Sequence, residues 1–391
     1  MTDQNQTHGF ADSDGHFRRK PSAFRSHISS DPTSDFPAQK DRYVLYLSWG
    51  CPWAHRTNIV RTLKALENII ELVVLDPDLG PDGWFFSGRL GTAERDPRYG
   101  FTLLRELYRK ADPEYTGRCT VPVLWDTQRE TIVNNESSEI IQMMYTEFDH
   151  LLLPAHVREL ELNHHPGGGG GFFYPVHPRA EIDAFNEWVY HKISNGVYKT
   201  GFATTQAAYE ENVYPLFQAL DLVEARLRQQ EPLPYLFGDH ITDADIRLYT
   251  TICRFDVAYY GIFRCNLKMI RHDYPLIDRW YRRLYHDDTE RTRGAFKKTT
   301  FFDIAPKPPT SPTQPQHTPN PDSIRAKFHG FALPVKVLTD FGLEDPAEKS
   351  SWSLPRIVHV RIRPIARVSD LLICLVGDLE FRVQEELVDI V

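Results

Sequence analysis

The sequence contains no apolar run near the roughly 20 residues that a membrane-spanning helix needs, and its first 15 residues lack the apolar core of a secretory signal. It contains 5 cysteines, but no C-x-x-C pair and no Cys and His spacing typical of a zinc site. A net charge of −8 disfavours nucleic acid as the main partner. These absences predict a cytoplasmic protein with free thiols and with no membrane, nucleic acid or metal partner.

What the chain does contain is one short stretch, around Cys51, where a reactive cysteine fits. The β-branched and aromatic residues of Tyr43–Leu47 predict a buried strand, and the apolar spacing in Ala54–Leu66 predicts a helix. Cys51 therefore falls where strand passes into helix, next to backbone N–H groups that favour an anion. We expect a thiolate with a pKa below the roughly 8.5 of free cysteine, with His55 and Arg56 adding positive charge. A buried, inert cysteine is the alternative.

Composition and periodicity divide the chain into five segments. The first is a polar arm with a small basic cluster at Arg18, Arg19 and Lys20, which we expect to be solvated and packed on the second segment. Strand and helix patterns alternate in the second, five consecutive glycines mark the third as a linker, and helical periodicity dominates the fourth. Closely spaced prolines open the last, which we expect to be poorly ordered. The fold class is α/β plus all-α, with segment boundaries at 1–40, 41–150, 151–179, 180–303 and 304–391.

Two boundaries in the second segment point to a binding site. A proline interrupts the strand-like run Thr120–Asp126, which indicates either an edge strand or a cis Val121–Pro122 bond that exposes backbone at a site. The stretch Asn134–Glu139 opens a helix, with Asn135 or Ser137 as its cap. Backbone N–H groups at that helix start form an anion cradle.

Helical periodicity in the fourth segment predicts a set of long helices. The stretch Thr242–Asp245 is an N-terminal capping signal, so we expect Asp245 to be structural rather than catalytic. The predicted helices are Ala180–Ser194, Gln206–Gln229, Thr242–Tyr260 and Tyr274–Tyr285.

An ordered set of short motifs runs through the chain: Cys51–Arg56, Gly83–Trp84, Tyr115–Arg118, Thr120–Asp126, Asn135–Ser137, Asn195–Lys199, Gly201–Ala203, Ala244–Leu248, Arg254–Asp256 and Tyr259. This set is similar to the xi-class glutathione transferases, the glutathionyl-hydroquinone reductases. The resemblance runs from about Phe17 to Asp303 and implies a thioredoxin-like N-terminal domain followed by an all-helical C-terminal domain.

The resemblance gives each residue of the expected site a role. Cys51 is implied as the catalytic nucleophile, and Tyr198 and Tyr259 as contacts for the ring and hydroxyls of a quinol. A helix start suits the glutathione carboxylate and a glutamate suits its ammonium. Each residue also has an ordinary alternative, as a packing anchor, a surface ion pair or a helix-start charge. The residues implied to bind glutathione are Trp84, Arg118, Val121, Glu136 and Ser137.

The implied activity is glutathione-dependent reduction of glutathionyl-hydroquinones through a Cys51–glutathione mixed disulfide, in a homodimer without metal. One alternative is an omega-like thiol transferase or dehydroascorbate reductase. Another is a non-catalytic binding module, because the chain departs from the family after Asp303 and the family's last substrate tyrosine has no counterpart here.

Overall fold

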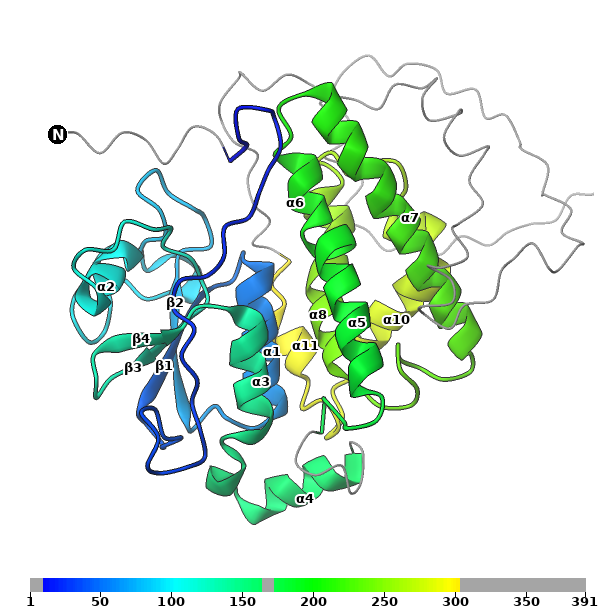
Figure 1. Ribbon diagram of the computed structural model, residues 1–391. Coiled ribbons are helices and arrows are strands. Elements are labelled where there is room, and N and C mark those ends of the chain that lie inside the picture. The colour runs from blue at the N-terminus through cyan, green and yellow to red at the C-terminus, as the bar shows by residue number, and fades with distance from the viewer. Residues whose placement is uncertain (1–9, 164–171, 303–391) are drawn as a thin grey trace, which may run out of the picture. The chain divides into compact units, whose positions relative to one another are not determined.

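The computed structural model describes residues 10–163 and 172–302, all of which belong to one compact unit within Met1–Leu343 (Figure 1). The predicted Pro-rich tail and the run of five glycines lie outside the described residues. The described residues form two halves, one built on a sheet and one built of helices.

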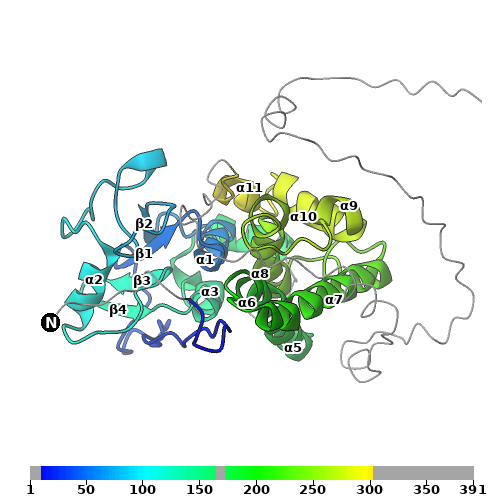
Figure 2. The same ribbon diagram turned by 90° about the horizontal axis from the view of Figure 1, so that it is seen from above.

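The N-terminal half is a four-stranded sheet with helices on both faces (Figures 1 and 2). Its elements are β1 Tyr43–Ser48, α1 Pro52–Leu63, β2 Ile70–Leu75, η1 Arg89–Gly91, α2 Leu104–Ala111, β3 Val123–Asp126, β4 Thr131–Asn134 and α3 Ser137–Thr146. The strand order is β2-β1-β3-β4, with β1 parallel to β2 and antiparallel to β3. Helices α1 and α3 lie on the face toward the helical half, and α2 lies on the other face. This is the thioredoxin-like arrangement that the sequence predicts.

The C-terminal half is all helical. Its elements are η2 Asp149–Leu151, α4 Pro154–Asn163, α5 Arg179–Val189, η3 Tyr190–Ser194, α6 Gly196–Gly201, α7 Gln206–Gln230, α8 Asp243–Ile252, η4 Phe255–Tyr259, α9 Ile270–Asp273, α10 Pro275–His286 and α11 Ala295–Thr299. The predicted helices are confirmed, and two of them continue as the π-helical turns η3 and η4. Within the described part of the chain, no helix is long and apolar enough to span a membrane.

The expectation that segment 151–179 is a linker throughout is wrong, because its first part contains helix α4. Pro154 is its first residue, a position that proline tolerates without losing a hydrogen bond. Leu160 is buried and Val157 packs against the core, one turn apart on the same face. This short apolar stripe stabilises the helix. The sequence did not predict it, because the run of glycines that follows indicated a linker.

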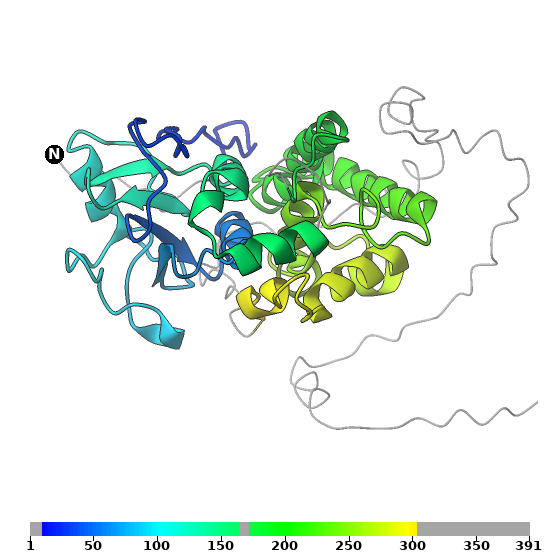
Figure 3. The ribbon, with the colours of Figure 1, turned by 90° about the horizontal axis from the view of Figure 1, so that it is seen from below.

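The N-terminal arm also differs from expectation, because it contacts both halves rather than the sheet half alone (Figure 3). Its later residues follow the end of β4, where Ser26 N–H donates to the Val133 carbonyl at 2.9 Å. Its earlier residues reach the helical half, where Phe10 stacks on Phe202 with ring centroids 4.4 Å apart. The arm is therefore an ordered strap across the two halves from residue 10 onward.

Asp245 is structural, as the sequence predicts. Its carboxylate is fully buried in the first turn of α8 and accepts hydrogen bonds from the backbone N–H and hydroxyl of Thr242 in a capping box. It also accepts from Leu236 N–H at 3.0 Å and from Trp280 Nε1 at 2.9 Å. One side chain thus joins the start of α8 to the preceding turn and to α10.

We expect Asp245→Ala to lower the free energy of unfolding by about 3–5 kcal/mol, because several buried donors lose a charged acceptor. Urea unfolding followed by circular dichroism measures the change. The matched control is Asp278→Ala, which removes an i,i+4 partner of Arg282 near the surface and should cost only about 0.5 kcal/mol. Equal losses in the two variants would contradict the role of Asp245.

Candidate functional site

Cys51 lies at the N-cap of α1, directly before Pro52 in the first turn. Its Sγ donates a hydrogen bond to the Val121 carbonyl at 3.7 Å, so two of the predicted site residues are in contact. The Val121–Pro122 bond is cis, so that alternative of the sequence analysis is confirmed. The loop before β3 therefore presents its backbone to the sulfur.

The expected direction of the Cys51 pKa is wrong in this structure. Burial raises the pKa of the thiol, and backbone hydrogen bonds from Ala54 and Trp53 with the charges of Arg254 and Arg19 oppose the rise without overcoming it. The residue is only 9% exposed, so little water can solvate a thiolate. The sequence predicts the helix start, but it does not predict that the helical half buries the cysteine there.

The two predicted quinol contacts, Tyr198 on α6 and Tyr259 on η4, lie side by side with ring centroids 6.1 Å apart. Trp53, two residues after the cysteine, packs on Tyr198 at 6.1 Å. Burial raises the pKa of both tyrosines, and a negative charge on Cys51 adds to the rise at Tyr198 when the thiol is deprotonated. The phenols therefore stay neutral near the sulfur and can donate hydrogen bonds.

Sequence reasoning missed Arg19, which was expected in a solvated cluster. Its guanidinium carbon lies 4.7 Å from the ring centre of Trp53 and 4.9 Å from that of Tyr198, and its Nε donates to Asn195 Oδ1 at 3.0 Å. Its neighbour Arg18 behaves as expected, since it is exposed and paired with acidic residues of the arm. No local pattern separates the two arginines, apart from the buried aromatic anchor Phe17 next to them.

The predicted carboxylate and ammonium contacts meet at the start of α3. Glu136 is the N-cap, where its side chain accepts from Ser138 N–H at 3.2 Å, so the predicted caps Asn135 and Ser137 are wrong. Ser137 is buried as the first residue of the helix. A pocket of about 300 Å³ opens here, lined by Glu136, Ser138, Arg56 and others.

The remaining predicted residues lie on loops of the sheet half. Arg118 packs under the ring of Phe10 from the arm at 5.3 Å, and burial, with Arg19 as a second cause, lowers its pKa. Trp84 follows β2 and accepts a backbone hydrogen bond from Leu104. Among the described residues, Trp84 makes no ring contact with the other predicted site residues.

Matches to known protein families cover both halves. Residues 50–147 match the model of the glutathione S-transferase N-terminal domain, and residues 206–283 match that of the C-terminal domain. The chain is 47% identical over 289 residues to glutathione S-transferase omega-like 2 of Schizosaccharomyces pombe, across 74% of this chain and 86% of that one. It is 45% identical over 258 residues to glutathionyl-hydroquinone reductase YqjG of Escherichia coli, across 64% and 73%.

Solved structures agree. The glutathione-S-transferase Xi of Phanerochaete chrysosporium superposes with a TM-score of 0.67 at 45% identity, over 75% of this chain and 87% of that chain. The Xi glutathione transferase ECM4 of Saccharomyces cerevisiae, in complex with glutathione, gives a TM-score of 0.67 at 38% identity, over 74% and 91%. This chain belongs to the xi class of the glutathione transferases. The fold class implied by its motifs is thereby confirmed.

In this xi-class transferase, Arg254 ties the cysteine loop to the helical half. One terminal nitrogen donates to the Trp49 carbonyl at 3.0 Å, and the other lies 2.7 Å from His55 Nδ1. Because a guanidinium only donates, Nδ1 accepts and neutral His55 carries its proton on Nε2, which lies 3.0 Å from Thr299 Oγ1. Burial lowers the pKa of His55 well below its usual range, so it does not add the positive charge expected from the sequence.

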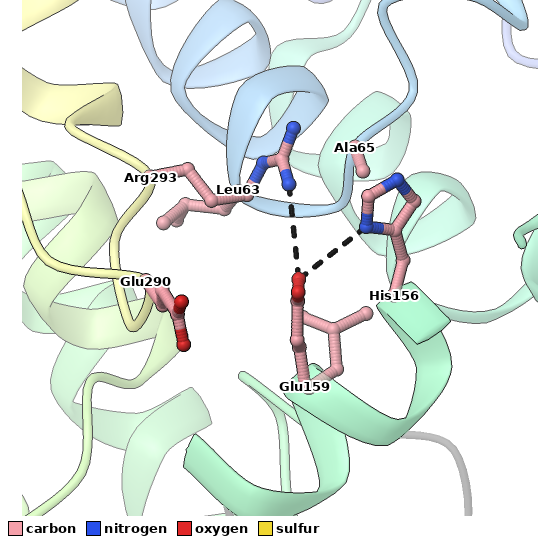
Figure 4. Close-up of a pocket in the computed structure, with 7 residues that line it drawn as sticks. Leu63, Ala65, His156, Glu159, Glu290 and Arg293 are labelled. Atoms are coloured by element: carbon pink, nitrogen blue, oxygen red, sulfur yellow. Dashed lines mark hydrogen bonds and ion pairs between the residues drawn. The ribbon is translucent and has the colours of Figure 1, made fainter. Parts of the chain in front are cut away.

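A much smaller pocket of the transferase lies between the end of α1, α4 and the segment before α11 (Figure 4). Its volume of about 10 Å³ has room for about one water. Glu159 spans it, 3.3 Å from His156 Nδ1 and 3.9 Å from an Arg293 terminal nitrogen. The pocket is too small for a tripeptide and shares no lining residue with the Cys51 site.

Within residues 10–163 and 172–302 of the transferase, no three His, Cys, Asp or Glu side chains gather as a metal site requires. The absence of a bound metal stays a prediction.

We expect alkylation of Cys51 in the free transferase to titrate with a midpoint above the roughly 8.5 of free cysteine, because burial disfavours the thiolate. Iodoacetamide labelling across pH, with mass spectrometry of the Cys51 peptide, measures the midpoint. Arg254→Met should raise it further by removing a favourable charge, whereas Arg279→Met, which removes an exposed arginine, should not change it. A midpoint below the free-cysteine value would contradict this account. So would an unchanged midpoint in Arg254→Met.

We expect His55 to make stability fall as pH drops below about 6.5, the usual pKa of histidine in an unfolded chain. Below that pH His55 binds a proton in the unfolded chain, whereas folded His55 stays neutral. Each pH unit of acidification therefore lowers the free energy of unfolding by up to about 1.4 kcal/mol. The stability that His55 contributes is present above that pKa and lost below it.

His55→Gln removes this titration, and its urea-unfolding free energy should fall less steeply with acid than that of the parent transferase. His272→Gln, at an exposed position, should keep the parent slope. Identical slopes for the parent and His55→Gln would show that His55 is not the linked group.

Proposed function

We propose that this enzyme reduces glutathionyl-hydroquinones with glutathione. The Cys51 thiolate attacks the glutathionyl sulfur, the hydroquinone leaves, and Cys51 is left in a mixed disulfide with glutathione. A second glutathione thiolate then attacks that disulfide, which frees Cys51 and releases oxidised glutathione. The observation that carries the proposal is a single cysteine at the start of α1 with a pair of neutral tyrosines beside it.

The cysteine complement supports a one-thiol mechanism. The described cysteines, Cys51, Cys119, Cys253 and Cys265, are all free thiols. The sequence has no C-x-x-C pair, so no cysteine stands three residues from Cys51, where the resolving thiol of that motif would lie. The resolving thiol is therefore assigned to glutathione.

The start of α3 and the loop before β3 support the glutathione site. The N–H groups of a ten-residue helix beginning at Ser137 suit the γ-glutamyl carboxylate, and Glu136 suits the ammonium. Val121 supplies backbone N–H and C=O for the cysteinyl part, as in a short strand addition. Trp84 and Arg118 are assigned to the rest of the tripeptide by the family resemblance.

The raised pKa of the Cys51 thiol adds a requirement for substrate binding. A protonated Cys51 is a poor nucleophile, so its proton has to leave when substrate occupies the site. The Val121 carbonyl that accepts the Cys51 S–H is also the backbone expected to pair with glutathione. Substrate binding at Val121 would thus release the sulfur from that hydrogen bond.

Relatives support the substrate class. The E. coli relative carries the name glutathionyl-hydroquinone reductase, and so does PcpF of Sphingobium chlorophenolicum, which is 43% identical. We further propose a cytoplasmic homodimer, which the family resemblance implies. The omega-like thiol transferase and the non-catalytic module remain the alternatives that the experiment below separates.

Incubating the enzyme with a glutathionyl-hydroquinone should give one glutathione on Cys51 by mass spectrometry, and free hydroquinone by chromatography. Cys51→Ala should lose both, while Cys119→Ala should keep them. Strong reduction of hydroxyethyl disulfide with no hydroquinone release would favour the thiol transferase. Retention on glutathione resin without turnover of either substrate would favour the binding module. Full activity in Cys51→Ala would overturn the mechanism.

A further inference from the structure

We propose that Arg19, from the N-terminal arm, contacts a quinol oxygen of the substrate and stabilises its negative charge as the carbon–sulfur bond breaks. The proposal rests on the proposed function and adds a catalytic residue that the arm supplies.

The surroundings of Arg19 hold a cation without using all its donors. Its guanidinium lies 4.7, 4.9 and 5.4 Å from the ring centres of Trp53, Tyr198 and Phe17, and its Nε is bonded to Asn195. Its two terminal nitrogens make no hydrogen bond to a described residue. Several N–H donors of a permanent cation therefore remain available inside an aromatic wall.

The charge of Arg19 reaches the reacting groups. It is one of the charges that act on the Cys51 thiol, on the Tyr198 phenol and on Arg118 of the expected glutathione site. The contact that fixes its position is the one with Tyr198, whose ring centre lies 4.9 Å from the guanidinium carbon.

The proposed reaction develops negative charge on a quinol oxygen, which a nearby cation stabilises. The ring carbon bearing sulfur first takes a proton from a ring hydroxyl, which gives a keto tautomer. Attack by the Cys51 thiolate then forms the sulfur–sulfur bond, and the electron pair of the carbon–sulfur bond restores the aromatic ring. The thiolate is oxidised to a disulfide, the carbon is reduced, and the negative charge ends on the quinol oxygen, which then takes a proton from solvent.

Other groups near the sulfur are less suited to that charge. Tyr198 and Tyr259 are neutral donors. Arg254 already donates to Trp49, His55 and the helix backbone. Arg19 therefore offers a full positive charge with free donors next to the aromatic pair.

The arm is anchored so that Arg19 keeps this position. Phe10 stacks on Phe202, Phe17 is buried against the same ring, and Thr204 N–H donates to the Gly15 carbonyl at 3.1 Å. Gly15 has φ 87°, and a Cβ there would lie 2.6 Å from Thr205 Cγ2, so only glycine fits this contact. The bend fixes the chain four residues before Arg19.

The test compares Arg19→Met and Arg19→Lys with the matched control Arg18→Met, whose parent residue is exposed and paired within the arm. Hydroquinone release is measured for a series of glutathionyl-hydroquinones with increasingly electron-withdrawing ring substituents. The Cys51 alkylation midpoint and hydroxyethyl disulfide reduction are measured in parallel.

We expect Arg19→Met to lower kcat for the unsubstituted substrate about 100-fold, the usual effect of losing one oxyanion contact. The loss should shrink along the series, because a more acidic phenol needs less stabilisation. Arg19→Lys should recover part of the rate, and Arg18→Met should behave as the parent. Disulfide reduction should change by less than about threefold, since no quinolate forms.

A loss of equal size for every substrate would overturn the proposal, as would a rate loss that the alkylation shift fully explains or that disulfide reduction shares. An unchanged kcat in Arg19→Met would overturn this inference and leave the proposed function intact. Failure of the parent enzyme to release any hydroquinone would instead overturn the proposed function, and this inference with it.

Discussion

Burial of helix α1 is the constraint on which the rest of the structure depends. All of its residues except Trp53 are buried, although several are polar or charged. Buried polar groups need partners, so α1 is stable only where neighbouring elements supply them. His55 is hydrogen-bonded to Arg254 and Thr299 of the helical half, and Arg61 donates to the Ile70 carbonyl of the sheet. The His55 contacts join the two halves beside Cys51, and the Arg61 contact holds α1 on the sheet.

The same burial decides the chemistry of the sulfur. A helix start and two arginines favour a thiolate, yet removal of water favours the thiol more strongly. The site therefore combines a protonated cysteine, neutral tyrosines and a cation carried by the arm. Where water is excluded, as around the buried sulfur, a fixed charge acts strongly on charge that develops during reaction. This is why the position of Arg19 matters more than its presence in a basic cluster.

Much of the fold could be predicted from local pattern. The run Tyr43–Leu47 reads as a buried strand and becomes β1, and the capping signal at Asp245 begins α8. Short ordered stretches carry the family motifs that predict Cys51, Val121 and Tyr198 as site residues, and the structure brings Cys51 and Val121 into contact. Helix α4 was missed, since its apolar stripe is short and lies next to a glycine run.

By itself, the sequence determined the strands of the sheet, the long helices, the helix start that holds Cys51 and the family. Only the tertiary structure decided the charge state of the site. Whether Cys51 or His55 is charged depends on water excluded by residues more than a hundred positions away, which no local pattern encodes. Likewise, Arg18 and Arg19 are equal in sequence, but packing exposes one and encloses the other in aromatic rings.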